Sequence, residues 1–221
     1  MSEVFYWSSY TEKMRRCHVY LPAEYFTNPT KKFPVLYLQH GMGENEYGWA
    51  EQGHTAQILD NLIAEGKAVP CIIVMDNGLN ARRPGEQGGF GFGGPRPQAG
   101  QGGPRPAGGR PQGAPGQGGP RRGFGGFSEG CKNVLFNDII PMVEKNYRVI
   151  ADTEHRAMAG LSMGGMQTRS ITMANPTTFA YVGMFSGGTF RAEDLKDAAD
   201  FKKTNKVLFM SCGGKENMGV D

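Results

Sequence analysis

The chain has 221 residues and is 38% hydrophobic, which suits one domain with a buried core, and no apolar run reaches the ~20 residues that span a bilayer. Its net charge of +3 is uneven, because residues 82–127 hold seven arginines and one glutamate and leave the rest mildly acidic. The four cysteines show neither CxxC spacing nor a Cys/His cluster. We therefore expect reduced core thiols rather than a metal site, with a disulfide as the minority alternative.

Predicted strands and helices alternate along the chain, which favours an α/β fold with a mostly parallel sheet covered by helices on both faces. Thr55 is a possible helix cap and Gly66 a helix stop, and Pro141 should kink its helix or lie in a first turn. In chain order we expect two strands within 4–25, a strand at 33–41, a helix at 55–68, a strand at 70–78, a helix at 131–149, a strand at 155–162, a helix at 164–176, a strand at 181–188, a helix at 192–204 and a strand at 206–214.

Residues 84–127 differ from the rest of the chain. They form imperfect repeats of Gly, Pro, Gln and Arg, and they contain no leucine, isoleucine or valine. Such a segment buries too little apolar surface to offset the entropy of ordering, which predicts a disordered insert within a single domain spanning 1–221. Because the insert follows the strand at 70–78, it leaves the carboxyl end of the sheet, where open α/β folds place their sites.

The segment Gly160-Leu161-Ser162-Met163-Gly164 fits the G-x-S-x-G pattern of a nucleophile turn. An apolar strand is predicted before it and a helix after it, as that turn requires. The glycines permit a tight turn that lifts Ser162 above the sheet, and the N-terminus of the following helix favours a developing oxyanion. We therefore predict Ser162 as a nucleophile, against the alternative of a plain glycine-rich turn.

A second loop should complete the oxyanion hole. His40-Gly41-Met42-Gly43 follows a predicted strand and can turn a backbone N–H toward the same site. The candidate donors are the backbone N–H groups of Met42 and Met163. For His40 we expect a structural role in orienting the loop. Nearby, Asp76-Asn77-Gly78 lines the cleft or makes a turn, and Trp49 packs its loop or offers a sugar platform.

Six blocks of the sequence resemble the esterase-D-like esterases, and most of all carbohydrate esterase family 1, the feruloyl and acetylxylan esterases, in their Bacteroidetes-like form. The resemblance implies an α/β-hydrolase fold, hydrolysis of acyl esters on plant cell-wall xylan without a metal or organic cofactor, and a secreted or periplasmic location, although the chain begins without a signal-peptide pattern. S-formylglutathione hydrolases and mycolyltransferases share the serine turn, so the chemistry is better specified than the substrate. The blocks are VLYLQHGMGENEYGW, DNLIAEGKAVPCIIVMDNG, NDIIPMVEKNYRV, EHRAMAGLSMGGMQT, FAYVGMFSGG and KVLFMSCGGKEN.

The resemblance also places the catalytic acid after the last predicted strand, at Glu216, which on spacing alone reads as a solvated loop charge. The fold's chain order is Ser, acid, His. Every histidine precedes Ser162, and His155 opens the strand that Ser162 ends, about 20 Å away. His40 is nearest by topology, as a minor candidate for a substitute base. We therefore expect the catalytic histidine, with the family's last strand and helix, to be absent from this polypeptide.

The sequence thus predicts a serine esterase of the feruloyl or acetylxylan type, acting on acylated xylan or on small aryl and acetyl esters. The alternative is an inactive esterase-like fragment that binds sugar or a partner protein. The basic insert is compatible with single-stranded nucleic acid and with acidic sugars, but its irregular spacing inside an enzyme-like fold argues against nucleic acid. We expect no membrane contact, and self-association through the uncovered strand at 206–214.

Overall fold

A computed structural model of the chain describes residues 1–79, 81–85, 125–190 and 192–216. Most of the predicted insert lies outside the described residues. Its predicted end at 127 is wrong, because helix α3 (Gly125–Val134) begins inside it. Cys131 and Val134 of α3 are buried and the helix packs against α5 (Met163–Ala174), so tertiary packing outweighs the low helix propensity of glycine at its start.

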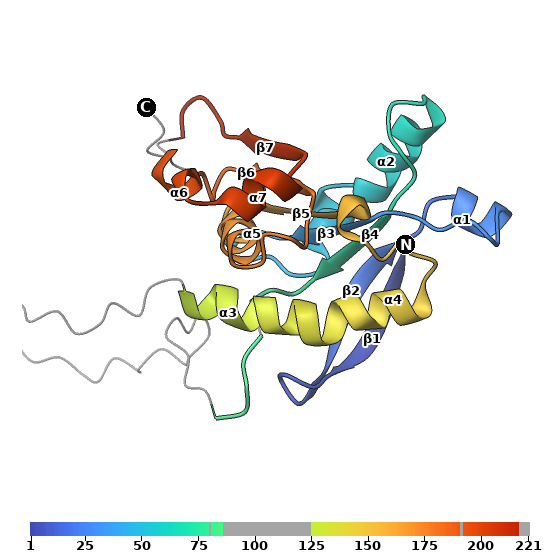
Figure 1. Cartoon of the computed structure of the whole chain (residues 1–221). Coiled ribbons are helices and arrows are strands. Elements are labelled where there is room, and N and C mark those ends of the chain that lie inside the picture. The colour runs from blue at the N-terminus through green and yellow to red at the C-terminus, as the bar shows by residue number, and fades with distance from the viewer. Residues whose placement is uncertain (80, 86–124, 191, 217–221) are drawn as a thin grey trace, which may run out of the picture.

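In the described residues, seven strands form one sheet in the order β1-β2-β4-β3-β5-β6-β7 (Figure 1). β1 and β2 form an antiparallel hairpin, β2 is antiparallel to β4, and the other neighbours are parallel. The predicted mostly parallel sheet is confirmed, and the two strands predicted within 4–25 form a hairpin with β1 at the edge of the sheet. The strands are β1 (Ser2–Ser8), β2 (Lys13–Tyr20), β3 (Val35–Gln39), β4 (Ile72–Asp76), β5 (Arg156–Leu161), β6 (Tyr181–Phe185) and β7 (Val207–Ser211).

Helices cover both faces of the sheet, as predicted. On one face α3 continues through a π-helical turn, η2 (Leu135–Ile139), into α4 (Ile140–Asn146). Figure 1 shows these three segments as one continuous helix that lies across β1 and β2. Pro141 lies in the first turn of α4, one of its two predicted positions. On the other face lie α2 (Thr55–Ala64) and the π-helix η1 (Gly48–Gln52). The shorter helices are α1 (Glu24–Thr27), η3 (Thr153–His155), α6 (Ala192–Lys196) and α7 (Ala199–Thr204).

The buried core divides into two clusters because β4 is buried on both faces. Ile72 and Val74 join the larger cluster under α3, α4 and α5, whereas Ile73 and Met75 join a smaller cluster under α2 and Trp49. Alternate residues of a strand point to opposite faces, so the two clusters lie on the two sides of the sheet. This arrangement explains the unbroken apolar run that predicted a buried parallel strand.

Two local predictions differ from the structure. Thr55 is the first residue of α2 rather than its cap, because His54 occupies the cap position and the Thr55 hydroxyl donates to Trp49 O at 2.6 Å. Gly66, with φ 68°, follows the end of that helix as predicted. The single helix predicted at 192–204 is two helices, and the break before α7 lets Phe201 pack into the core at 5.5 Å from the Phe190 ring.

The four cysteines are free thiols, as predicted, but only Cys17 and Cys131 are buried in the core, whereas Cys71 is half-buried and Cys212 is exposed. Burial raises the pKa of Cys17, Cys71 and Cys131, to about 11 for Cys71, so these thiols stay protonated at neutral pH. Across the part of the chain that the structure describes, no helix has the length and apolar character needed to cross a bilayer.

Candidate active site

Ser162 occupies a strained turn between β5 and α5. Its backbone has φ 52° and ψ −109°, a conformation that residues with a side chain rarely adopt. The turn is held from both sides, because the Ser162 N–H donates to Phe185 O at 2.8 Å and the Ser162 carbonyl accepts the Met166 N–H at 3.0 Å. The strand, the sharp turn and the helix are the structural context that the G-x-S-x-G pattern requires.

The glycines around Ser162 bring the first turn of α5 onto the end of β3. A Cβ atom on Gly160 would lie 2.3 Å from Gly164, and one on Gly164 would lie 2.5 Å from Gln39 O and 2.7 Å from His40 O. Only glycine permits these approaches without movement of the backbone. The loop after β3 therefore begins directly beside the serine turn.

Replacing Gly164 by alanine should lower the free energy of unfolding by about 1–3 kcal/mol, the usual cost of overpacking, because the added methyl group meets rigid backbone oxygen atoms. Thermal melting of Gly164→Ala measures this loss. Gly214→Ala is the matched control, since a Cβ there meets nothing within 4 Å. Equal melting temperatures for the two variants would contradict the close approach.

In the loop after β3, a bond from the His40 ring fixes the direction of one backbone N–H. The His40 ring is buried, and its Nδ1 lies 2.7 Å from Gly41 O, a hydrogen bond in which Nδ1 is the donor. In a planar trans peptide the N–H points opposite to the C=O, so this bond turns the Met42 N–H away from the His40 ring. The Gly41 N–H is bound separately, to Glu44 Oε2 at 2.8 Å. Glu44 is a loop-positioning residue that sequence reasoning missed.

Met42 and Met163 differ in exposure, although both are candidate oxyanion donors through their backbone. Met42 is 44% exposed, whereas the Met163 side chain is buried beneath the turn. The Met163 N–H belongs to the first turn of α5, where N–H groups have no partner within the helix and carry the positive end of its dipole. This arrangement stabilises negative charge beside Ser162.

A second strained turn follows β6 and connects Ser162 with Glu216. Ser186 has φ 49°, and its hydroxyl donates to Glu216 Oε1 at 3.1 Å. A Cβ on the next residue, Gly187, would lie 2.5 Å from Ser162 O, so this turn touches the Ser162 turn directly. Sequence reasoning missed Ser186, although a Ser-Gly-Gly run straight after a strand was the available signal.

The structure does not bring His18, His54 or His155 to Ser162. His155 lies at the start of β5, at the opposite edge of the sheet, and pairs with Asp152 at 2.7 Å. His18 lies within β2 with its ring 4.4 Å from the Tyr47 ring, and His54 precedes α2 at the surface.

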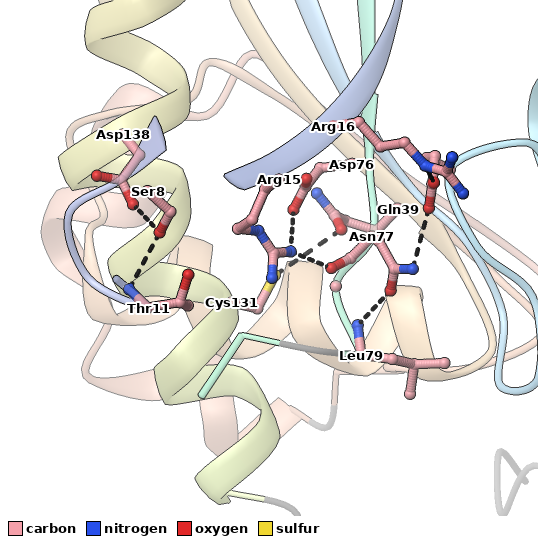
Figure 2. A network of polar contacts seen from close by, with 12 residues as sticks. Ser8, Thr11, Arg15, Arg16, Gln39, Asp76, Asn77, Leu79, Cys131 and Asp138 are labelled. Atoms are coloured by element: carbon pink, nitrogen blue, oxygen red, sulfur yellow. Dashed lines mark hydrogen bonds and ion pairs between the residues drawn. The ribbon is translucent and has the colours of Figure 1, made fainter. Parts of the chain in front are cut away.

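A buried polar network joins the start of β2 to the end of β4 (Figure 2). Arg15 Nη2 lies 3.1 Å from Asp76 Oδ2 and also donates to Asn77 O, and Tyr6 donates to Asp76 Oδ1 at 2.8 Å. Asn77 Oδ1 accepts the Leu79 N–H at 3.2 Å, which makes a turn. Asp76 is only 3% exposed, so of the two predicted alternatives the structure gives the turn.

Glu46 extends this network to the loop that carries Met42. Its carboxylate is almost fully buried, accepts from Arg16 Nε and accepts from Asn77 Nδ2 at 3.0 Å. Burial alone raises the pKa of Glu46, but its hydrogen bonds from the backbone, Arg16 and Asn77 outweigh burial and lower it. The charged carboxylate therefore ties the loop to the end of β4. Trp49 packs the same loop, donating from Nε1 to Gln39 O at 2.9 Å with its ring against Phe185.

The site is thus a strained serine at a strand-to-helix turn, facing a helix N-terminus and a glycine-rich loop, on the sheet of an α/β-hydrolase. The chain matches the family described as "Putative esterase" over residues 8–101 and 125–214, and it belongs to that esterase family. The predicted family resemblance and α/β-hydrolase fold are confirmed.

Two curated proteins and one solved structure are similar to this chain over most of its length. The chain is 39% identical over 221 residues to the endo-1,4-beta-xylanase/feruloyl esterase of Xylanibacter ruminicola, covering 98% of this chain and 25% of that protein. It is 34% identical over 196 residues to endo-1,4-beta-xylanase Y of Acetivibrio thermocellus, covering 83% of this chain and 14% of the other. The CE1 ferulic acid esterase AmCE1/Fae1A from Anaeromyces mucronatus is similar with a TM-score of 0.68 and 25% identity, covering 98% of this chain and 72% of that one. The chain thus spans a quarter or less of the two curated relatives.

Proposed function

We propose that the chain is a serine carboxylesterase module of the feruloyl or acetylxylan esterase type. The observation that carries the proposal is the strained Ser162 turn, seated against a loop whose peptide is oriented by His40. Strained backbone held in place by several contacts is typical of catalytic turns.

In the proposed reaction Ser162 Oγ attacks the ester carbonyl carbon while a base takes its proton. The negative charge that forms on the carbonyl oxygen is held by the N–H groups of Met42 and Met163. The C–O bond to the sugar or alcohol then breaks, the leaving oxygen takes up a proton, and an acyl-serine remains. Water attacks that acyl group and releases the acid, which regenerates Ser162.

Glu216 has the role of the acid that orients the base, and Ser186 positions Glu216. None of the four histidines in this sequence is placed to act as the base. Three lie away from Ser162, and the His40 Nε2, which the Nδ1–Gly41 bond leaves free, is buried and has no hydrogen-bond partner among the described residues, Ser162 Oγ included. We therefore include in the proposal that the base is supplied by a group outside these 221 residues. A module that only binds sugar or protein is the alternative reading.

Substrate assignment follows from two relatives whose names include xylanase activity, one of which also carries feruloyl esterase in its name. Esters of aromatic acids on xylan, and small aryl or acetyl esters, are the proposed substrates, and a secreted or periplasmic location suits such a polymer. The direct test is mass spectrometry after reaction with an activated aryl ester of ferulic acid. A feruloyl adduct on the peptide that contains Ser162, absent in Ser162→Ala, supports the proposal, whereas an adduct elsewhere or none refutes the assignment of the nucleophile.

The outer strand β7 leads us to propose self-association as well. Val207, Phe209 and Met210 are exposed, and Phe209 and Tyr181 lie on the face of the sheet that carries α2. Within the described residues no strand pairs with the free edge of β7. An exposed apolar edge of this kind favours association between chains.

Replacing Phe209 by lysine should shift the chain toward the monomer, because a charged side chain on an exposed edge strand opposes association. Sedimentation velocity at several protein concentrations measures the change. Lys67→Ala, at a charged surface position away from β7, is the control and should leave the distribution unchanged. A wild-type chain that is a monomer at every concentration would overturn this part of the proposal.

A further inference from the structure

The β1–β2 hairpin presents a row of exposed apolar side chains on one face. Phe5 is 62% exposed, and Trp7 and Met14 are each 60% exposed. In the register of the hairpin Trp7 lies opposite Met14 and Phe5 lies opposite Arg16, so the four side chains share that face. The residues between them point to the other face and are partly or fully buried, so the hairpin is well packed and exposes this one face.

The exposed face lies at the carboxyl ends of the parallel strands, as Ser162 does. Cys17 pairs with Asp76, the last residue of β4, so the part of the hairpin that carries Phe5, Trp7 and Met14 extends beyond the carboxyl end of β4. Ser162 follows the carboxyl end of β5, which is three strands from β2 in the sheet. Phe5 and Trp7 lie on β1, four strands from β5, so at about 4.8 Å between strands they lie roughly 20 Å from Ser162.

Tyr47, in the loop that carries Met42, contacts the hairpin. The Tyr47 hydroxyl donates to Glu3 Oε1 at 2.5 Å, and the Arg16 guanidinium lies 5.0 Å from the centre of the Tyr47 ring. Arg16 also pairs with Glu3 at 3.2 Å and with Glu46 of the same loop. Contacts therefore run from the hairpin face through Arg16 to Tyr47, which belongs to the same loop as the exposed Met42.

We propose that this hairpin face is an accessory binding surface for the polysaccharide chain whose acyl group reaches Ser162; the choice of acylated xylan as the polymer rests on the proposed function. Phe5 and Trp7 are two residues apart on one strand, about 6.6–6.8 Å, and their ring faces can take the apolar faces of pyranose rings. Glu3, Arg16 and Tyr47 lie beside them as hydrogen-bonding partners for sugar hydroxyls. Aromatic surface with a few placed polar groups is the usual composition of a ligand site.

The charges on this face favour a neutral sugar polymer over other occupants. The buried centres of protein interfaces are depleted in charged residues, whereas the Arg16 and Glu3 side chains here remain 44% and 33% exposed beside the rings. Because Arg16 is paired with Glu3 and Glu46, the face offers no unpaired row of cations for phosphate groups.

Affinity electrophoresis in gels that contain soluble arabinoxylan tests the inference without requiring catalysis. The double variant Phe5→Ala/Trp7→Ala should bind at least tenfold more weakly than the wild type. The matched control is Phe26→Ala, which removes a 73% exposed aromatic ring from α1 and should bind like the wild type. Equal melting temperatures show that the variants fold. Undiminished binding by the double variant overturns the inference.

Two parallel measurements separate this inference from the proposed function. Binding to xylan that depends on Phe5 and Trp7, with no acyl adduct at Ser162, refutes the proposed function and leaves the binding surface standing. An adduct at Ser162, with binding to xylan that does not depend on Phe5 and Trp7, supports the proposed function and refutes the binding surface. Sedimentation of the same variants gives the third outcome, because a wild-type dimer that dissociates in the double variant shows that the face binds a second copy and overturns the inference.

Discussion

The 221-residue chain should hydrolyse 4-nitrophenyl acetate and methyl ferulate about 10³–10⁴-fold more slowly than a form extended beyond Asp221 by the corresponding segment of the Xylanibacter ruminicola relative. Under the proposal that the base lies outside these 221 residues, only oxyanion stabilisation and substrate binding remain to accelerate the reaction. Steady-state kinetics on the two forms measure the difference. Ser162→Ala should change the short chain little and the extended chain by the full factor.

Added imidazole provides an independent check on the same reasoning. A small base that diffuses to Ser162 can take its proton, so imidazole should increase the part of the hydrolysis that disappears in Ser162→Ala. The same concentrations applied to that variant correct for hydrolysis by imidazole itself. Fast turnover by the short chain without imidazole, lost on His40→Ala, would show that His40 is the base and would overturn this account.

The strand-to-helix turn at Ser162 was predictable because every determinant is local. Gly160, Ser162 and Gly164 lie within five residues, and the apolar strand and the helix that frame them are adjacent in sequence. The mostly parallel character of the sheet also follows from the apolar runs of the strands and their alternation with helices, whereas the order of the strands was not predicted. Local patterns of this kind were sufficient for the fold class and for the position of Ser162 in it.

The supporting contacts were not predictable, because they join residues distant in sequence. Ser186 reaches Glu216 across 30 positions, and Asn77 reaches Glu46 across 31. A single sequence carries no signal for such pairs, since serine, asparagine and glutamate are common in loops. The start of α3 at Gly125 was missed for a related reason, because packing against α5 extends a helix into residues whose own propensity opposes it.

The buried Arg15–Asp76 pair is the contact of this kind with the largest expected effect on stability. The two side chains are 7% and 3% exposed, and Asp76 accepts from both Arg15 and Tyr6. Replacing Asp76 by alanine leaves the Arg15 charge buried without its carboxylate, which should lower the free energy of unfolding by about 3–5 kcal/mol. That loss is a large share of the roughly 5–15 kcal/mol that holds a typical domain together. Urea unfolding followed by circular dichroism measures it.

The matched double variant Arg15→Met/Asp76→Leu shows whether the stability lost in Asp76→Ala comes from the broken ion pair or from lost packing. Replacing both charges with apolar side chains of similar size removes the unpaired charge, so most of the stability should return. Activity in the extended form should not return with it, because Arg15 also donates to Asn77 O and Asn77 holds Glu46, in the loop of the proposed oxyanion donor Met42. If the double variant were as unstable as Asp76→Ala, packing rather than charge would explain the loss. If it regained full activity, the network would stabilise the fold without positioning the loop.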